Sequence, residues 1–528
     1  MKKGTVLKTI ILISLIALFL ILTNIPHLVA YFKTPEGMNF VGTNGGFPDA
    51  NTYFAKMLEG QEGKWLYENR FTSEEHKGAF VNTFYVLSGH FAKWFNLSLV
   101  AIFQTARIIF GIALCLAIYF LSSLFFKKFA WRMVVLILSL LPLGFGWILR
   151  LVGSNLNLPD VYLGEGNNFL SLILYPHFTA AVALMILTFI AIIKIFTSKK
   201  SWLWAIGGGL SCLGIALIHP YPIIVIWIMI ALIPAMVIIK FKKIELDKLF
   251  KLATVAIIPA PLIIYQFYVF RFQAVFKDWA LQNTCPRGPL IIYFLGYGLI
   301  AILAIVGIYH IIKNKSKIKY YLVALWGVVN FLAIAIPLSF QRKLIEGAQV
   351  PLVILGIIGL IFLFKKFKLK KWTVVSLTSV LIIISSLSII PILKDYYKPV
   401  QAENREIYYS DSEKEAFDWI KTNYDNYPLV LSKDFRGGYL VWKSNVRVYV
   451  GHWSETVNFY DDKVVQVESF FRGKMNISDM KDFLRDNQID LVYIGEGEEF
   501  DPPAEFLGIE EVFSNEKITI FENQNLDK

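Results

Sequence analysis

Asp49 is the residue of this chain whose type and setting best suit acid–base chemistry. It lies in the stretch 47–53, FPDANTY, shortly after the first apolar segment. A carboxylate beside a membrane is costly, so one held there is expected to have a task. Asp49 and Tyr53 are four residues apart and share one face if the stretch is helical. The competing interpretation is that Asp49 caps a short helix beginning near Ala50, because Asp is a favoured cap.

The composition places this acid in a membrane protein. Of the 528 residues 56% are hydrophobic and only 17% are charged, which is more apolar and less charged than a soluble domain. The net charge of +12 comes from Lys residues in short clusters between apolar runs. That distribution is typical of a multispanning protein rather than of a nucleic-acid partner.

Crossing a bilayer takes about 20 apolar residues, and about 11 segments meet that test. They are 10–31, 98–125, 132–152, 169–193, 202–218, 222–239, 252–270, 290–312, 320–339, 351–364 and 372–391. The first is too long for a signal peptide and lacks a small-residue cleavage site before Pro26. We therefore interpret it as an uncleaved first span.

The basic clusters predict the orientation of these spans, because cytoplasmic loops carry an excess of Lys and Arg. With a cytoplasmic N-terminus, every alternate loop is basic: 127–128, 199–200, 240–251, 313–319 and 365–371. An odd number of spans then places the tail outside the cytoplasm. The sequence predicts a multi-pass protein of the cell membrane with an extracytoplasmic C-terminal domain.

Two domains follow from this pattern. Residues 1–391 form the transmembrane domain, which includes a long first outer loop, 33–97. Residues 392–528 form an extracytoplasmic α/β domain, because helical and strand patterns intermix there. The predicted helices are 412–424, 459–471 and 477–487, and the predicted strands are 429–432, 446–450, 491–495 and 518–522.

The chain resembles the GT-C fold glycosyltransferases, the broad group that holds the protein O-mannosyltransferases and the lipid A aminoarabinose transferases. The resemblance is one of layout, and four features carry it. They are the first outer loop with Pro48-Asp49 and Tyr53, the acidic second outer loop with Asp160 and Glu165, the stretch from Arg342-Lys343 through Glu346-Gly347 to Pro351, and the α/β tail.

The resemblance implies an enzyme that takes a sugar from a polyprenyl-phosphate carrier to a protein, glycan or lipid acceptor outside the cytoplasm. Family members use an Asp of the first outer loop as the base, and Asp49 is the matching position. Many relatives have a second acid beside it, whereas here Ala50 follows. Asp160 or Glu165, with Tyr53, is then the candidate partner for the acceptor or for a cation.

The leaving lipid phosphate is a dianion and needs cations at the depth of the headgroups, where Arg binds phosphate in bidentate fashion. Arg342 and Lys343 are the first candidates, because positive charges are disfavoured at the outer end of a span. Arg271 and Lys77 are weaker candidates. The alternative for Arg271 and Arg342 is that the side chain only reaches the interface.

Other polar residues carry weaker signals. Three widely spaced cysteines give neither a disulfide framework nor a metal site. The turn 451–456, GHWSET, could touch acceptor or sugar, but its His and Glu lack metal-site spacing, and we expect no catalytic role for it. No metal ligands are predicted from spacing, and a requirement for a divalent cation stays open.

Two other functions are compatible with the layout. A transporter or flippase of lipid-linked sugars would share the spans and the phosphate contacts, but its acids are expected near the midplane. A non-catalytic scaffold that binds a partner through its tail would leave Asp49 without a task. Most acids of this chain lie in the predicted outer loops and the tail, which favours the glycosyltransferase.

Overall fold

The computed structural model describes residues 3–154, 156–243, 245–314, 316–498, 500 and 509–524. These residues form two compact units. The first, the membrane unit, comprises Met1–Leu28, Phe103–Tyr265 and Cys285–Lys398. The second, the loop–tail unit, comprises Val29–Ile102, Gln266–Thr284 and Pro399–Lys528. Asp49 and the C-terminal residues therefore belong to the same unit.

The membrane unit is entirely helical in the part of the chain that the structure describes. Its helices, wholly or in part, are α1 (Lys3–Phe32), α4 (Leu99–Phe125), α5 (Phe129–Leu140), α6 (Gly146–Leu151), α7 (Pro159–Tyr162), α8 (Asn168–Ile173), α9 (Pro176–Thr197), α10 (Ser201–Ile218), α11 (Pro222–Phe241), α12 (Leu246–Ile257), α13 (Ala260–Phe272), α15 (Ile291–Lys313), α16 (Ile318–Ala333), the 3-10 helix η1 (Gln341–Ile345), α17 (Gln349–Lys366), α18 (Lys371–Ser386) and α19 (Ile389–Gln401).

Among the described residues, nine helical stretches are long and apolar enough to cross a membrane. They are Gly4–Phe32, Leu99–Phe125, Pro176–Thr197, Ser201–Ile218, Pro222–Phe241, Leu246–Phe272, Ile291–Lys313, Gln341–Lys366 and Lys371–Gln401. Two shorter apolar helices, Phe129–Leu140 and Ile318–Ala333, accompany them. The predicted polytopic helical fold is confirmed, and each predicted apolar segment overlaps one of these helices.

Several predicted spans begin or end elsewhere than expected, and proline explains most of the differences. The predicted span 132–152 is two helices, α5 and α6, separated by Leu141–Phe145 with Pro142 and Gly144. The predicted span 169–193 is interrupted before Pro176, where α9 begins. A proline lacks the backbone N–H that a continuing helix needs, so it ends one helix and starts the next.

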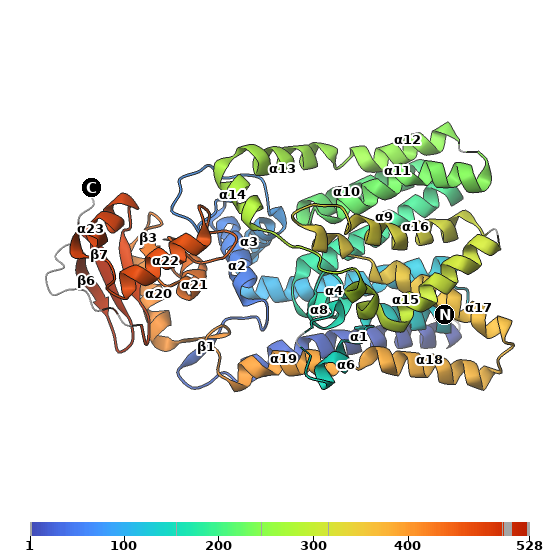
Figure 1. Ribbon diagram of the computed structural model, residues 1–528, viewed down its shortest axis with the longest axis horizontal. Coiled ribbons are helices and arrows are strands. Elements are labelled where there is room, and N and C mark those ends of the chain that lie inside the picture. The colour runs from blue at the N-terminus through green and yellow to red at the C-terminus, as the bar shows by residue number, and fades with distance from the viewer. Residues whose placement is uncertain are drawn as a thin grey trace. The chain divides into compact units, whose positions relative to one another are not determined.

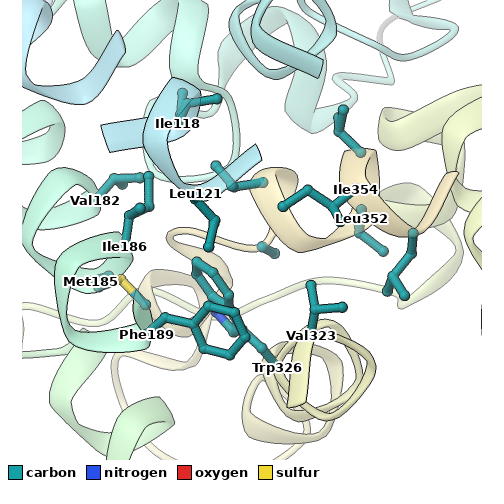
Figure 2. Close-up of a cluster of buried hydrophobic side chains, with 14 of the residues drawn as sticks. Ile118, Leu121, Val182, Met185, Ile186, Phe189, Val323, Trp326, Leu352 and Ile354 are labelled. Carbon is teal, nitrogen blue, oxygen red and sulfur yellow. The ribbon is translucent and has the colours of Figure 1, made fainter. Parts of the chain in front are cut away.

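Side chains from α4, α9, α16 and α17 form part of the buried apolar core of the membrane unit (Figure 2). Phe189 and Trp326 pack with their ring centroids 4.6 Å apart. Leu121 and Met185 lie nearer these rings than Ile118 does, and all of these side chains are buried. Large aromatic side chains dominate such contacts because they bring the most apolar area together.

The loop–tail unit begins with strand β1 (Met38–Phe40) and helices α2 (Phe47–Glu62) and α3 (Thr83–Phe95) from the first loop, and it includes α14 (Ala274–Gln282). Helices α2 and α3 cross at two glycines. A Cβ atom on Gly60 would lie 1.8 Å from the carbonyl oxygen of Val86, and one on Gly89 would lie 1.8 Å from that of Met57. Only glycine permits this approach, so the pair fixes how α2 is held.

The tail folds as a small α/β structure (orange to red in Figure 1). Its strands are β2 (Tyr408–Ser410), β3 (Leu429–Leu431), β4 (Arg447–Val448), β5 (Leu491–Ile494), β6 (Ile509–Ser514) and β7 (Thr519–Asn523). Its helices are α20 (Asp411–Asn423), α21 (Asp434–Ser444), α22 (Tyr460–Phe471) and α23 (Ile477–Asp486). The sheet order is β4-β3-β5-β7-β6, with β3 parallel to β4 and β5, and β7 antiparallel to β5 and β6.

The first loop and the tail are joined by a second, two-stranded sheet. Strand β1 pairs antiparallel with β2, with Asn39 opposite Tyr409. Each predicted strand and helix of the tail is present within a few residues of its expected bounds. The structure adds β2, α21 and β6, which the sequence did not predict.

Candidate functional site

Asp49 lies in the first turn of α2, which starts earlier than the sequence indicated. The N-cap of α2 is Gly46, in the left-handed conformation at φ 64°, and Ala50 N–H donates to the Gly46 carbonyl at 3.0 Å. The interpretation of Asp49 as the cap of a helix beginning near Ala50 is therefore wrong. The positive end of the helix dipole favours a carboxylate in this turn.

The Asp49 carboxylate faces His452 from the tail. Asp49 Oδ1 lies 3.3 Å from His452 Nε2. The His452 side chain is buried, whereas the Asp49 side chain is 48% exposed. An acid that is open on one side and held on the other has the setting that a general base needs, because a substrate can reach it.

His452 belongs to a loop, Gly451–Thr456, that its own hydrogen bonds hold tightly. The Thr456 Oγ1 accepts from the backbone N–H groups of Gly451 at 3.1 Å and His452 at 3.3 Å. The Thr456 N–H donates back to the His452 carbonyl at 2.9 Å. From α14, the Gln282 side-chain amide donates to the carbonyl of Thr456 at 2.8 Å.

A buried ion pair attaches the same loop to α2 two turns after Asp49. Lys56 Nζ lies 2.5 Å from Glu455 Oε1, and Tyr67 O–H donates to Glu455 Oε2 at 2.6 Å. Burial and the Glu455 charge raise the pKa of Tyr67, so its hydroxyl keeps the proton that it donates. Lys56 also donates to Thr52 Oγ1 at 3.0 Å.

Tyr53 lies on the same face of α2, as its spacing from Asp49 predicts. Its ring stacks on that of Tyr85 from α3, with centroids 4.3 Å apart and planes 8° from parallel. Burial, and next the charge of Asp49, raise the pKa of Tyr85. Asp49, Tyr53, Tyr85 and His452 thus form one group within the loop–tail unit.

Arg342 and Lys343 lie on η1 in the membrane unit and contact different partners. Arg342 Nη2 is 3.5 Å from Glu165 Oε1, a carboxylate that is 7% exposed, and 3.9 Å from Cys285 Sγ. Lys343 Nζ lies 3.3 Å from the Tyr221 hydroxyl and above its ring. Two residues predicted for different roles, Arg342 and Glu165, are therefore brought together.

A second buried pair lies beside η1. His219 Nδ1 is 2.7 Å from Glu346 Oε2, and both side chains are buried. Burial, with the Lys343 charge, lowers the pKa of His219 to about 3, so the ring is neutral in this contact. Nothing in the local sequence around His219 indicates this contact.

Asp160 is buried in the membrane unit, where its carboxylate accepts two hydrogen bonds. Its Oδ2 accepts from the N–H of Gly146 at 2.9 Å and from the hydroxyl of Ser388 at 2.6 Å. Burial raises the pKa of Asp160 to about 6, against the smaller opposing effect of these hydrogen bonds. Its role as an acceptor or cation partner stays a prediction.

Arg271 and Lys77 are exposed side chains of the loop–tail unit. Arg271 is in the last turn of α13 and lies 5.9 Å from the centroid of the neighbouring Phe272 ring. Among the described residues, no group of three or more His, Cys, Asp and Glu side chains could hold a metal ion.

Neither models of protein families nor curated protein sequences give a significant match to this chain. Solved structures do match, and they show that the chain has the fold of the GT-C membrane glycosyltransferases. The expected fold is confirmed. At the identities given below the likeness establishes the fold alone.

Three of these solved structures are similar to this chain to the following extent. The oligosaccharyltransferase of Archaeoglobus fulgidus in its apo form matches 92% of this chain and 69% of its own, at 11% identity and a TM-score of 0.53. ArnT from Cupriavidus metallidurans, bound to undecaprenyl phosphate, matches 96% of this chain and 98% of its own, at 9% identity and a TM-score of 0.53. The mycobacterial arabinofuranosyltransferase AftD matches 96% of this chain and 41% of its own, at 11% identity and a TM-score of 0.50.

Proposed function

We propose that this protein is a membrane glycosyltransferase that moves a sugar from a polyprenyl-phosphate carrier to an extracytoplasmic acceptor, with Asp49 as the general base. The observation that carries the proposal is the Asp49 carboxylate, half exposed at the start of α2 and held at 3.3 Å by the buried His452. The GT-C fold supports it, as does the undecaprenyl phosphate bound by ArnT.

The proposed step begins at the acceptor hydroxyl, which is a poor nucleophile until a base takes its proton. Asp49 accepts that proton as the acceptor oxygen bonds to the anomeric carbon of the sugar. The bond between that carbon and the phosphate oxygen breaks, and its electron pair leaves with the lipid phosphate. One base is sufficient for inversion, whereas retention through a covalent intermediate needs a second carboxylate as nucleophile.

The lipid phosphate gains one negative charge when it leaves, so we propose that cationic side chains bind it. Arg342 can offer a bidentate fork to phosphate oxygens, and Lys343 can add a point charge. Glu165, 3.5 Å from Arg342, is placed to orient the guanidinium, and this geometry favours that role over binding of acceptor or cation. Arg271 and Lys77 stay weaker candidates.

The experiment that tests the function uses purified full-length protein in liposomes with a labelled polyprenyl-phosphate sugar and fractionated envelope acceptors. The proposal predicts a new glycosidic bond, detected by mass spectrometry of the acceptor. A flippase would move the labelled lipid between leaflets without any new bond, and a scaffold would do neither. Either of these results overturns the proposal.

A further inference from the structure

We propose that His452, a residue of the tail, is a positioning residue that holds the Asp49 carboxylate through its Nε2–H, an inference that rests on the proposed function. The contact joins residues 403 positions apart in the sequence. The inference concerns which nitrogen carries the ring proton, and the loop itself supplies the answer.

The other ring nitrogen, Nδ1, is surrounded by donors. The backbone N–H of Ser454, the Ser454 hydroxyl and the backbone N–H of Glu455 each lie 3.3 Å from His452 Nδ1. A backbone N–H can only donate, so Nδ1 must accept and cannot carry a proton. The neutral ring then has its proton on Nε2, the atom that faces Asp49.

The same arrangement disfavours a proton on Nδ1. A doubly protonated ring would point an Nδ1–H at two backbone N–H groups, and burial of His452 leaves water no room to relieve that clash. His452 is therefore a fixed donor, and it does not compete with Asp49 for the acceptor's proton. The partner of a functional side chain commonly fixes its orientation in this way.

The rest of the loop makes the donor rigid. Glu455 lies three residues after His452. It forms an ion pair with Lys56 at 2.5 Å and accepts a hydrogen bond from Tyr67 at 2.6 Å. Lys56 lies seven residues after Asp49, so both contacts are on one face of α2. The titratable groups near the pair include Lys56, Glu455, Tyr67 and Tyr85 of α3. Asp434, at the start of α21, also lies close enough to His452 to interact with it electrostatically.

Two substitutions separate positioning of Asp49 from anchoring of the loop. His452→Gln keeps a donor at the reach of Nε2 and loses the acceptor near Nδ1. His452→Asn keeps an acceptor near Nδ1 and cannot reach Asp49. Positioning predicts that His452→Asn lowers kcat for sugar transfer by roughly 10- to 100-fold, the usual range for such partners, and that His452→Gln recovers most of the rate. A loop anchor alone predicts the opposite order, which would overturn the proposal.

A double substitution tests whether His452 acts through Asp49. Asp49→Asn/His452→Asn should be no slower than Asp49→Asn alone, since interacting residues are not additive. If the second substitution lowers the residual rate by its full factor, His452 does not act through Asp49. A loss of rate in Asp49→Asn but not in His452→Asn removes only this inference, whereas a loss in neither removes the proposed function.

A spectroscopic measurement of the His452 tautomer tests the proposal without an activity assay. Nitrogen-15 solid-state NMR of histidine-labelled full-length protein in nanodiscs, at neutral pH, distinguishes the two neutral tautomers. Of the seven histidines, the signals lost in His452→Asn belong to His452. The proposal predicts the Nε2–H tautomer, and an Nδ1–H tautomer or an imidazolium would contradict it.

Discussion

Lys56 and Glu455 form a buried ion pair, 2.5 Å from Nζ to Oε1, between the first loop and the tail. The two residues are 399 positions apart. This pair fixes α2 to the tail two turns after Asp49. The geometry around the proposed base therefore depends on residues of both the first loop and the tail.

Glu455→Gln should destabilise the loop–tail unit strongly, because it leaves the buried Lys56 charge without an opposite charge. The expected loss is about 3–5 kcal/mol, and Lys56→Met/Glu455→Leu should recover most of it. Thermal unfolding in detergent measures both. The control is Arg472→Ala, whose ion pair with Glu468 is exposed and worth about 1 kcal/mol or less. Equal unfolding midpoints for Glu455→Gln and Arg472→Ala would contradict the assignment.

Asp160 should make the protein less stable as the pH rises through weakly acidic values. Its pKa is about 6 in the folded protein and 3.8 ordinarily, so between those values the folded state binds the proton and the unfolded state does not. Stability therefore falls by about 3 kcal/mol from about pH 4 to above pH 6. This loss of stability arises because burial disfavours the charged form of Asp160.

Asp160→Asn tests that pH dependence. Asn can still accept from Gly146 and Ser388 but does not titrate, so its unfolding midpoint should rise relative to wild type as the pH goes from 4.5 to 7.5. Asp482→Asn, at an exposed position, should follow the wild type. Parallel curves for Asp160→Asn and wild type would show that Asp160 is not the titrating group.

The sequence was sufficient to predict the fold, and it was insufficient to predict the partners of Asp49. Long apolar runs can be recognised from the local sequence, since each span needs about 20 such residues. His452 and Glu455 do not, because their role arises from a contact 403 and 399 positions away. The one available signal was the polar turn after a strand, which we did not expect to be catalytic.

Helix α21 shows why local patterns failed elsewhere. It contains Gly437 and Gly438, which disfavour a helix. A Cβ on Gly437 would lie 2.2 Å from the Val450 carbonyl oxygen, and one on Gly438 would lie 2.9 Å from Asn51 Nδ2. Trp442 of the same helix donates to Asn51 at 2.9 Å. The glycines serve packing against α2 and the loop before His452, which no local propensity reveals.

Arg342→Ala should weaken binding of a polyprenyl-phosphate sugar by roughly 10- to 100-fold, the value of a charged hydrogen bond. Arg342→Lys should recover only part, since the bidentate fork is lost. Binding of labelled donor to the purified protein measures this, with Arg472→Ala as the control. Unchanged donor affinity in Arg342→Ala would remove Arg342 from the phosphate site.

The alternation of basic loops predicts the topology. A reporter fused after Tyr397 should respond as extracytoplasmic, and one fused after Lys317 as cytoplasmic, because basic loops stay inside. Paired alkaline phosphatase and fluorescent-protein fusions give the two readings. A cytoplasmic signal after Tyr397 would mean that the span count is wrong.

The central claim is that Asp49 is the base, and Asp49→Asn tests it most directly. Since Gly46 is the cap of α2, Asn at position 49 loses the dipole interaction of the first turn, about 0.3–1 kcal/mol, and its amide oxygen can still accept from His452 Nε2–H. Folding and donor binding should persist. The matched control is Asp461→Asn, which alters an acid in the first turn of α22 and should leave transfer unchanged.

The measurement is the rate of sugar transfer from a labelled polyprenyl-phosphate donor, with the unfolding midpoint recorded for each variant. The account predicts that Asp49→Asn transfers sugar about 10²- to 10⁴-fold more slowly than wild type, the range for losing a positioned base. A well-folded Asp49→Asn protein that transfers sugar at the wild-type rate would contradict it.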